Sequence, residues 1–213
     1  MDKPTCRTCL MKPIMLRSLA DRVDTSRRAV RRRWRKLLML SWTLSRWHYS
    51  RYDMVLAGRP SDPVWYFAYG SNMHHSAFRE RRGMRPTESR VARVPGYRLR
   101  FNLDGRPKGK AAPANICPDP DGELWGVLYR ITRRELLRLD STEGVPGRHY
   151  RHVLVPAEDT DGNIVTAVTY MARGNETDGL PSLRYISLLR EGARVHGLPE
   201  AWVHFLDSVT HGE

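Results

Sequence analysis

From residue 64 onward, short apolar runs with the length of single β-strands alternate irregularly with segments of helical periodicity. The strand-like runs span residues 64–69, 91–102, 123–131, 149–156 and 164–172, and turn residues bound most of them. Pro95-Gly96 is expected to break the second run, and residues 119–122 are predicted to form a turn before the third. Helices are predicted over residues 71–82, 132–144, 183–196 and 200–209. This alternation favours an α+β fold, with a small mixed sheet or β-barrel surrounded by helices.

The positive charge of the chain is concentrated at its beginning. Residues 1–60 hold 15 of the 36 basic and 4 of the 23 acidic residues, a net charge of +11. Residues 61–213 hold 21 basic and 19 acidic residues, a net charge of +2. Two prolines in the segment 59–63 mark a linker or turn. We therefore predict a basic N-terminal extension, residues 1–60, followed by a nearly neutral domain, residues 61–213, which is no platform for nucleic acid.

The N-terminal extension allows several interpretations. Residues 27–36 are mostly arginine and lysine, and Val30, Trp34 and Leu37 could line one face of a basic amphipathic helix. Such a helix could bind nucleic acid or an anionic membrane. Its composition favours instead a disordered arm, or a segment that is not translated, with Met54 as the start. Cys6 and Cys9 have CxxC spacing without a second ligand pair, so we predict no zinc site there.

The cysteine count bears on the compartment. Three cysteines spread over 213 residues argue against a disulfide scaffold and suit a reducing environment. No apolar run approaches the roughly 18 residues of a membrane-spanning helix, and no export signal is evident. We expect a cytoplasmic protein.

The predicted helix over residues 132–144 places an acid near its end. Thr132 and Glu135 have the spacing of a capping box, and Gly144 ends the helix, so Glu143 lies in its last turn. The leucines expected to face inward are Leu136, Leu137 and Leu139. The negative end of the helix dipole and partial burial would both disfavour the charged form of Glu143, which suits proton transfer at neutral pH. From this pattern alone, a solvated surface glutamate is the simpler explanation.

The first strand leads directly into Gly70, Ser71 and Asn72. Glycine allows a ligand to approach the backbone closely, and Ser71 or Asn72 could cap the helix that follows. Free N–H groups at a helix start can hold an anion such as a carboxylate. An ordinary strand-to-helix turn is the simpler explanation from spacing alone.

Taken together, these patterns resemble the γ-glutamylcyclotransferase family. Tyr-Gly-Ser-Asn, residues 69–72, follows the first strand, and Leu-Asp-x-x-Glu-Gly-Val, residues 139–145, ends a later helix. A tyrosine, Tyr150, stands seven residues after Glu143. Residues 184–199, with Tyr185, Gly-Ala and Gly-Leu-Pro, resemble the ending of the family. The likeness covers about residues 64–209, and the basic extension has no counterpart in it.

The resemblance implies a small mixed β-barrel with surrounding helices and an enzyme without cofactor or metal. The implied reaction converts a γ-glutamyl amino acid or amine to 5-oxoproline plus the free amino acid or amine, with Glu143 as general acid and base. The implied substrate-binding residues are Tyr66, Phe67, Ala68, Tyr69, Gly70, Ser71, Asn72, Tyr150 and Tyr185. Removal of a γ-glutamyl group from glutathione or a secondary metabolite stays open as an alternative, as does a non-catalytic binding module of the same fold.

The partner expected from the resemblance is a small γ-glutamyl molecule, and a homodimer stays open. Other residues that could bind a metal have simpler explanations. His74 and His75 are adjacent and would diverge on a helix, so they cannot share a metal ion. Asp159 begins a stretch that resembles a calcium loop, but Tyr170 occupies the position where that loop needs a glutamate, so we predict a hairpin turn. Cys117 is expected to be a lone structural thiol.

Overall fold

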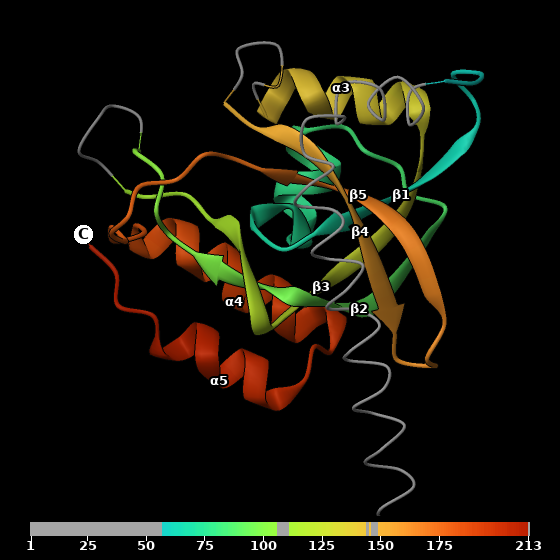
Figure 1. Cartoon of the computed structure of the whole chain (residues 1–213). Helices are drawn as coiled ribbons and strands as arrows, with labels where there is room; N and C mark the ends of the chain where they lie inside the picture. Colours follow the sequence, from blue (N-terminus) through green and yellow to red (C-terminus); the bar gives the residue numbers. More distant parts are fainter. Residues whose placement is uncertain (1–56, 106–110, 144, 146–148, 213) are drawn as a thin grey trace, which may run out of the picture. The chain divides into compact units, whose positions relative to one another are not determined.

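The computed structural model describes residues 57–105, 111–143, 145 and 149–212 (Figure 1). The basic N-terminal extension, with the predicted amphipathic helix and the Cys6–Cys9 pair, lies outside the described residues. Where the described chain begins, the predicted turn is present. The Arg59 amide donates to the Asp62 carboxylate at 2.7 Å, and the Asp62 amide donates to the Arg59 carbonyl at 3.0 Å.

Five strands close into a barrel, which confirms the predicted fold class (Figure 1). They are β1 (Pro63–Ala68), β2 (Glu88–Arg100), β3 (Asn115–Thr132), β4 (Arg151–Asp159) and β5 (Ile164–Met171). The order around the barrel is β1-β3-β2-β4-β5, and β5 closes it by pairing with β1 in parallel. The other neighbouring pairs are antiparallel, so the barrel is mixed.

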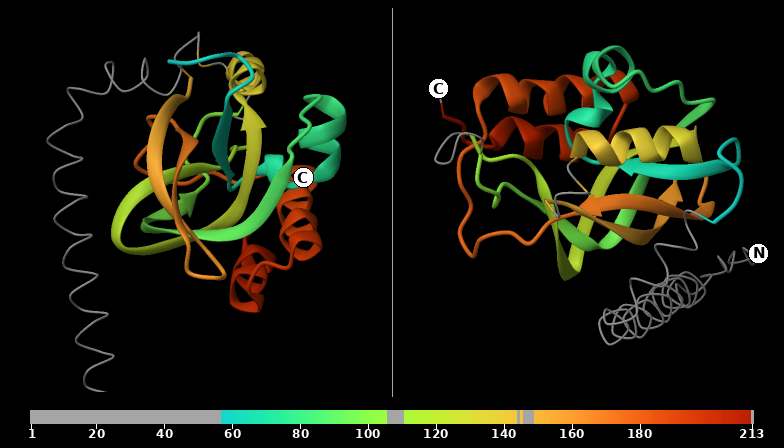
Figure 2. Two further views of the ribbon diagram at one scale, coloured as in Figure 1. Left: turned by 90° about the vertical axis from the view of Figure 1, so that its right-hand side faces the viewer. Right: turned by 90° about the horizontal axis from the view of Figure 1, so that it is seen from above.

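Within the described residues, three α-helices lie outside the barrel. They are α3 (Arg133–Glu143), α4 (Leu183–His196) and α5 (Glu200–Ser208). Helices α4 and α5 run side by side, and α3 crosses another part of the barrel (Figure 2). The predicted stop of α4 is confirmed, because Gly197 adopts the left-handed conformation with φ 69°.

The prediction of a single helix over residues 71–82 is wrong. The segment forms a 3₁₀ turn, η2 (Ser71–Met73), and a short π-helix, η3 (Ser76–Arg81). Between them His74 is extended, with φ −86° and ψ 134°. Its Nδ1 accepts from the Ser76 amide at 3.1 Å, a local bond that competes with the helical ladder.

The predicted cap at the start of this segment is also wrong. Gly70 is the cap residue of η2 and makes no side-chain cap hydrogen bond. The side chain of Asn72 instead points toward α3 and donates to Glu143. The side-chain amide of Asn72 therefore belongs to the site described below.

Strand β3, which pairs with β2, begins earlier in the chain than the sequence predicts. The break at Pro95-Gly96 is confirmed by a register shift between Pro95 and Tyr97, with Gly96 at φ 82°. The predicted turn at residues 119–122 lies inside β3, at this irregularity, and β3 begins at Asn115 rather than at Glu123. Strand β3 pairs with β2 up to Pro118 and again from Glu123 onward, and residues 119–122 form a bulge between the two paired stretches. Sequence periodicity could not show that pairing continues on both sides of these residues.

Helix α3 begins as the sequence predicts. The Glu135 carboxylate accepts from the Thr132 amide at 2.8 Å, and the Glu135 amide donates to Thr132 Oγ1 at 3.2 Å. This reciprocal pair is the predicted capping box. Leu136 and Leu139 are fully buried, but Leu137 is 48% exposed, so the expectation that Leu137 faces inward is wrong. Leu137 follows a buried position directly and therefore turns toward the opposite face of the helix.

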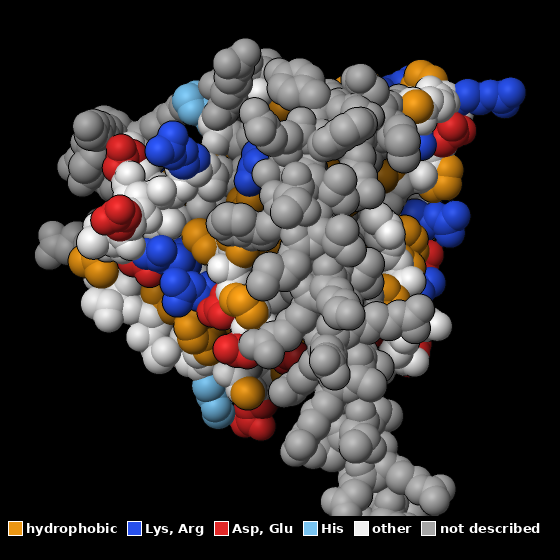
Figure 3. Space-filling view, viewed as in Figure 1, with side chains coloured by type: hydrophobic (Ala, Val, Ile, Leu, Met, Phe, Trp, Pro, Cys, Tyr) orange, Lys and Arg blue, Asp and Glu red, His pale blue; other side chains and the backbone are white. Residues whose placement is uncertain are grey.

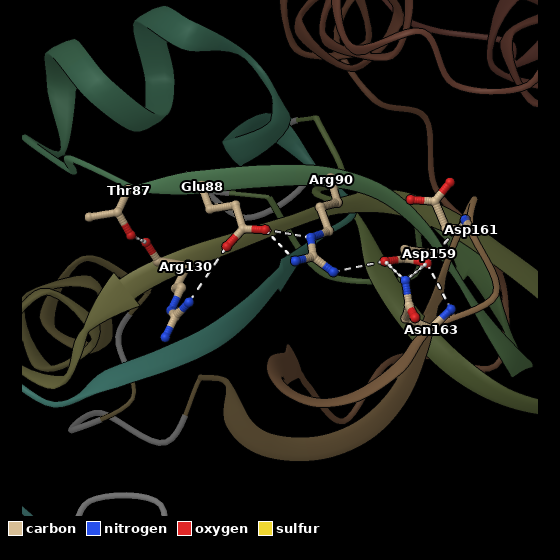
Figure 4. A network of polar contacts seen from close by, with 7 residues as sticks. All are labelled: Thr87, Glu88, Arg90, Arg130, Asp159, Asp161 and Asn163. Carbon is tan, nitrogen blue, oxygen red and sulfur yellow. Dashed lines mark hydrogen bonds and ion pairs between the residues drawn. The ribbon is translucent and has the colours of Figure 1, made fainter.

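The turn between β4 and β5 is the predicted hairpin. The Asp159 carboxylate accepts from the amides of Asp161 and Asn163 at 3.1 and 2.8 Å. Arg90 Nη1 donates to the same carboxylate at 2.9 Å, and Arg90 also bonds Glu88 on β2 (Figure 4). This network lies across neighbouring strands and ties the hairpin to β2.

The surface of the described part shows charges of both signs. Arginine, aspartate and glutamate side chains are interspersed on the face in Figure 3. This distribution agrees with the net charge of +2 for residues 61–213. Within the described residues, no helix has the length and apolar character needed to cross a membrane.

Candidate active site

A cavity opens where the end of β1, the end of α3 and the first turn of α4 meet. Its volume is about 40 Å³, a few times the roughly 10–15 Å³ that a cavity needs to hold one water molecule. It can therefore enclose one small polar group of a ligand whose remainder extends outward. The lining residues are Tyr66, Tyr69, Gly70, Ser71, Asn72, Ala114, Glu143, Tyr150, Tyr170 and Tyr185.

A larger cavity, of about 380 Å³, lies beside Met73 and Phe78. Several of its polar groups are paired with one another, as His74 is with Glu191 at 3.1 Å and Tyr129 is with His196 at 2.9 Å. A carboxylate, an amide and several phenols converge only in the smaller of these two cavities. We therefore take the smaller cavity as the candidate site.

Glu143 is the last residue of α3, as the sequence predicts. The turn at Arg59–Asp62 holds the opposite end of the helix, because the amides of Arg133 and Arg134 donate to the Asp62 and Pro60 carbonyls. With its start fixed there, α3 projects its last residue into the cavity. The Glu143 side chain is 15% exposed, so the cavity partly shields it from water.

Two donors reach the Glu143 carboxylate. Asn72 Nδ2 lies 3.0 Å from Oε1, and Arg82 Nη2 lies 2.7 Å from the same oxygen. Asn72 Nδ2 also donates to the Tyr66 hydroxyl at 2.8 Å. Both contacts hold the carboxylate through one oxygen and so fix its orientation. The sequence argument for Glu143 could not include these two partners.

Two tyrosines hold the backbone of Ala114 at the edge of the cavity. Tyr150 donates to the Ala114 carbonyl at 2.9 Å, and the Ala114 amide donates to the Tyr185 hydroxyl at 3.1 Å. A Cβ atom on Gly70 would lie 3.3 Å from the Tyr185 oxygen, so glycine permits this close approach. Burial raises the pKa of both phenols, which keeps them neutral.

Tyr66 and Tyr170 form the inner wall, with ring centroids 5.6 Å apart. Tyr170 donates to Asp140 Oδ1 at 2.6 Å, and His152 Nε2 lies 2.6 Å from the same oxygen. Burial raises the pKa of both phenols. A nearby carboxylate acts in the same direction, Glu143 for Tyr66 and Asp140 for Tyr170. The phenols of Tyr66 and Tyr170 are therefore neutral at neutral pH.

Comparison with known proteins adds independent information. The profile of the AIG2-like family matches residues 123–206. A gamma-glutamylcyclotransferase of Bos taurus is 30% identical over 160 residues, which cover 72% of this chain and 82% of the relative. One of Mus musculus is 29% identical over 163 residues, which cover 74% of this chain and 84% of the relative. The chain belongs to the γ-glutamylcyclotransferase family.

The solved structure of a gamma-glutamyl cyclotransferase supports the same assignment. It superposes with a TM-score of 0.63 at 26% sequence identity, covering 71% of this chain and 90% of that structure. The γ-glutamylcyclotransferase fold therefore extends over 71% of this chain.

Within this γ-glutamylcyclotransferase fold, most of the residues singled out from the sequence come together. Those that line the cavity are Tyr66, Tyr69, Gly70, Ser71, Asn72, Glu143, Tyr150 and Tyr185. Phe67 and Ala68 do not line it. Both are fully buried in β1, where the Phe67 ring lies against Gly126 on β3. They support the site from within the barrel rather than facing a ligand.

Three residues of the site were missed by the sequence argument. Tyr170 and Ala114 line the cavity, and Arg82 contacts Glu143. Tyr170 lies in a buried strand whose pattern does not distinguish a core tyrosine from a wall of the site. Arg82 belongs to a run of arginines that is typical of a solvated face, and Ala114 contributes through its backbone. Only contacts between distant segments reveal these three.

Proposed function

We propose that this chain converts a γ-glutamyl amino acid or γ-glutamyl amine to 5-oxoproline and releases the free amino acid or amine. Membership of the γ-glutamylcyclotransferase family identifies the chain as an enzyme. The observation that carries the proposal is the meeting of Glu143 with the turn at residues 69–72 in one cavity, with Asn72 Nδ2 3.0 Å from Glu143 Oε1.

The proposed reaction occurs within one substrate molecule. The α-amine nitrogen forms a bond to the γ-carbonyl carbon, and the bond from that carbon to the leaving nitrogen breaks with its electron pair on the nitrogen. The α-amine loses one proton and the leaving nitrogen gains one. Because nucleophile and electrophile belong to one molecule, folding the substrate into a ring-closing shape can contribute about 7–11 kcal/mol.

Glu143 is proposed to carry the proton between the two nitrogens. As a carboxylate it takes the proton from the attacking amine, and as a carboxylic acid it gives one to the leaving nitrogen. The neighbouring phenols are neutral because of burial, so none competes with Glu143 as a base near neutral pH. No step of this reaction requires an added group.

The turn at residues 69–72 is proposed to hold the substrate. Its backbone N–H groups can bind the α-carboxylate and the oxygen of the γ-carbonyl as charge develops there. Tyr150 and Tyr185 fix the opposite wall through Ala114. The small enclosed volume suits the reacting carbonyl, and the leaving group then extends toward solvent.

A cytoplasmic location suits this function. Cys117, the cysteine within the described residues, is a free thiol. An unpaired thiol is compatible with the reducing conditions of the cytoplasm.

The test is to incubate the protein with γ-glutamyl amino acids, γ-glutamyl amines and glutathione and to measure 5-oxoproline. We expect product from at least one γ-glutamyl amino acid or amine. Glu143→Gln should lower kcat by at least about 100-fold, because proton transfer by a positioned side chain contributes roughly 10²–10⁴-fold.

The matched control is Glu176→Gln, which changes an exposed acid in the same way. It should retain wild-type turnover. Full activity of Glu143→Gln would remove the proposed mechanism. Absence of product from every compound would remove the proposed function. Turnover of glutathione alone would show that the substrate is glutathione and not a γ-glutamyl amino acid or amine.

A further inference from the structure

The guanidinium of Arg82 spans the end of the helix that carries Glu143. Nη2 donates to Glu143 Oε1 at 2.7 Å, and Nε donates to Thr142 Oγ1 at 3.2 Å. Arg82 follows η3 and lies 61 residues before Glu143 in the chain. It places a positive charge against the last turn of α3, where free carbonyl groups make the helix end negative.

This ion pair differs from the other arginine pairs at the surface. The side chains of Arg82 and Glu143 are 13% and 15% exposed. In the exposed pair between Arg194 and Asp207 the corresponding values are 52% and 37%. Water and salt screen exposed pairs, so they contribute little, whereas a shielded charge acts strongly on its partner. The charge on Arg82 therefore acts on Glu143 with limited screening.

Both donors to Glu143 reach the same oxygen. Asn72 and Arg82 donate to Oε1, and within the described residues no group donates to Oε2. A carboxylate held through one oxygen has a defined orientation, and its second oxygen stays free to exchange a proton with a ligand. The geometry thus separates an anchored oxygen from a reacting oxygen.

We propose that Arg82 is a positioning residue that keeps Glu143 ionised and leaves Oε2 to carry the proton. This inference rests on the proposed function. Arg82 itself gains and loses no proton, because guanidinium stays charged in proteins. Once Glu143 has taken the α-amine proton, the adjacent positive charge favours its return to carboxylate. The Oε2–H bond then breaks as the N–H bond of the leaving nitrogen forms, so Arg82 assists the release of the product amine.

The test compares Arg82→Gln and Arg82→Lys with the wild type on the γ-glutamyl compound that the wild type turns over fastest. The control is Arg81→Gln, because Arg81 precedes Arg82 in the chain and is exposed. We expect Arg82→Gln to lower kcat by about 10- to 100-fold, a part of the full contribution of proton transfer. KM should change by less than about threefold, since Arg82 is proposed to act in the proton transfer and not in ground-state binding.

The pH profile supplies the readout that a purely structural role would not move. In Arg82→Gln the acidic limb of kcat/KM should move toward higher pH, because the carboxylate loses its positive partner. Arg82→Lys keeps the charge without the fork of donors, so its limb should stay at the wild-type pH while kcat falls less. Arg81→Gln should match the wild type in both respects.

The inference is overturned if Arg82→Gln matches Arg81→Gln in kcat and in the acidic limb. If thermal melting shows that Arg82→Gln does not fold, the inference is tested on the acidic limb of the kcat/KM profile of Arg82→Lys. A limb at the wild-type pH supports the effect of charge, and a displaced limb contradicts it. A wild-type protein that forms no 5-oxoproline from any compound would instead remove the proposed function, so the two failures are distinguishable.

Discussion

Single polar residues behind the cavity hold its walls in place. Asp140 is only 4% exposed and accepts from the Tyr170 hydroxyl at 2.6 Å. His152 lies 2.6 Å from the same carboxylate oxygen. The ring of Tyr170 packs against Tyr66, so a carboxylate buried behind the cavity fixes a residue that faces it. The Leu-Asp-x-x-Glu pattern therefore supplies two acids with different tasks, one facing the cavity and one supporting it.

We predict that Asp140→Ala lowers the free energy of unfolding by about 3 kcal/mol, because the buried groups of Tyr170 and His152 lose their acceptor. For a domain of this size, the melting temperature should fall by roughly 6–12 °C. Thermal and urea unfolding measure the effect. Glu176→Ala, at an exposed acid, serves as the control and should stay within about 0.5 kcal/mol of the wild type. A stability of Asp140→Ala equal to this control would show that the buried carboxylate contributes nothing.

At the scale of elements, helix α4 carries a wall residue of the cavity and rests on the turn beside it. Ser182 caps its start, where its hydroxyl accepts from the Tyr185 amide, and Tyr185 in the first turn reaches the cavity. Farther along the same helix, Gly192 packs against Met73 in η2. The Gly-Ala pair of the sequence thus marks the contact between α4 and the segment that holds Asn72.

The prediction at this scale is that Gly192→Ala weakens substrate binding. A Cβ atom at this position would lie 2.9 Å from the Met73 carbonyl carbon and 3.1 Å from the His74 nitrogen, so α4 and η2 must separate. Alanine favours a helix by about 1 kcal/mol over glycine, but overpacking costs about 1–3 kcal/mol. We expect a net loss of up to about 2 kcal/mol and a several-fold higher KM.

Steady-state kinetics and thermal melting check this prediction. Val195→Ala is the matched control, because it introduces the same residue at a position of α4 that is 73% exposed. Unchanged KM and melting temperature in Gly192→Ala would mean that the contact between α4 and η2 yields without affecting the site.

At the scale of the whole described part, the barrel assembles the site from segments that are distant in the chain. Strand β1 pairs with β3 on one side and with β5 on the other, so the turn after β1 lies near Ala114 and Tyr170. A Cβ atom on Gly126 would lie 2.3 Å from the Ala68 carbonyl oxygen, so glycine is needed where β1 and β3 approach most closely. Closure of the barrel is therefore a condition for the cavity.

We predict that a shortened chain beginning at Met54 folds and keeps wild-type turnover. The closed barrel, helices α3, α4 and α5 and the described residues that line the cavity lie within residues 57–212. The Arg59–Asp62 turn, which accepts hydrogen bonds from the start of α3, is retained. Circular dichroism and the 5-oxoproline assay measure the outcome. Loss of turnover in a folded, shortened chain would assign residues 1–53 a part in the reaction.

Local patterns were sufficient to predict the elements that begin and end at definite residues. The capping box of Thr132 and Glu135 sets the start of α3, so Glu143 at its end was predictable. The end of α4 at Gly197 and the hairpin turn after Asp159 were predictable as well. Both depend on side-chain or backbone preferences within a few residues. The alternation of strand-like and helical segments was enough to predict an α+β fold, whereas most of the cavity residues were predicted only through the resemblance to the γ-glutamylcyclotransferase family.

Tertiary structure alone decided which side chains meet Glu143. Arg82 and Tyr170 reach the site through contacts across 61 and 30 residues, to Glu143 and Asp140 respectively, and no local periodicity encodes such pairs. The division of residues 71–82 into a 3₁₀ turn and a π-helix has this origin in part, because packing against α4 and the pairing of Asn72 with Glu143 add to the local bond between His74 and Ser76. The sequence by itself determined where the acid lies on its helix, and the fold determined the charge and the amide that surround it.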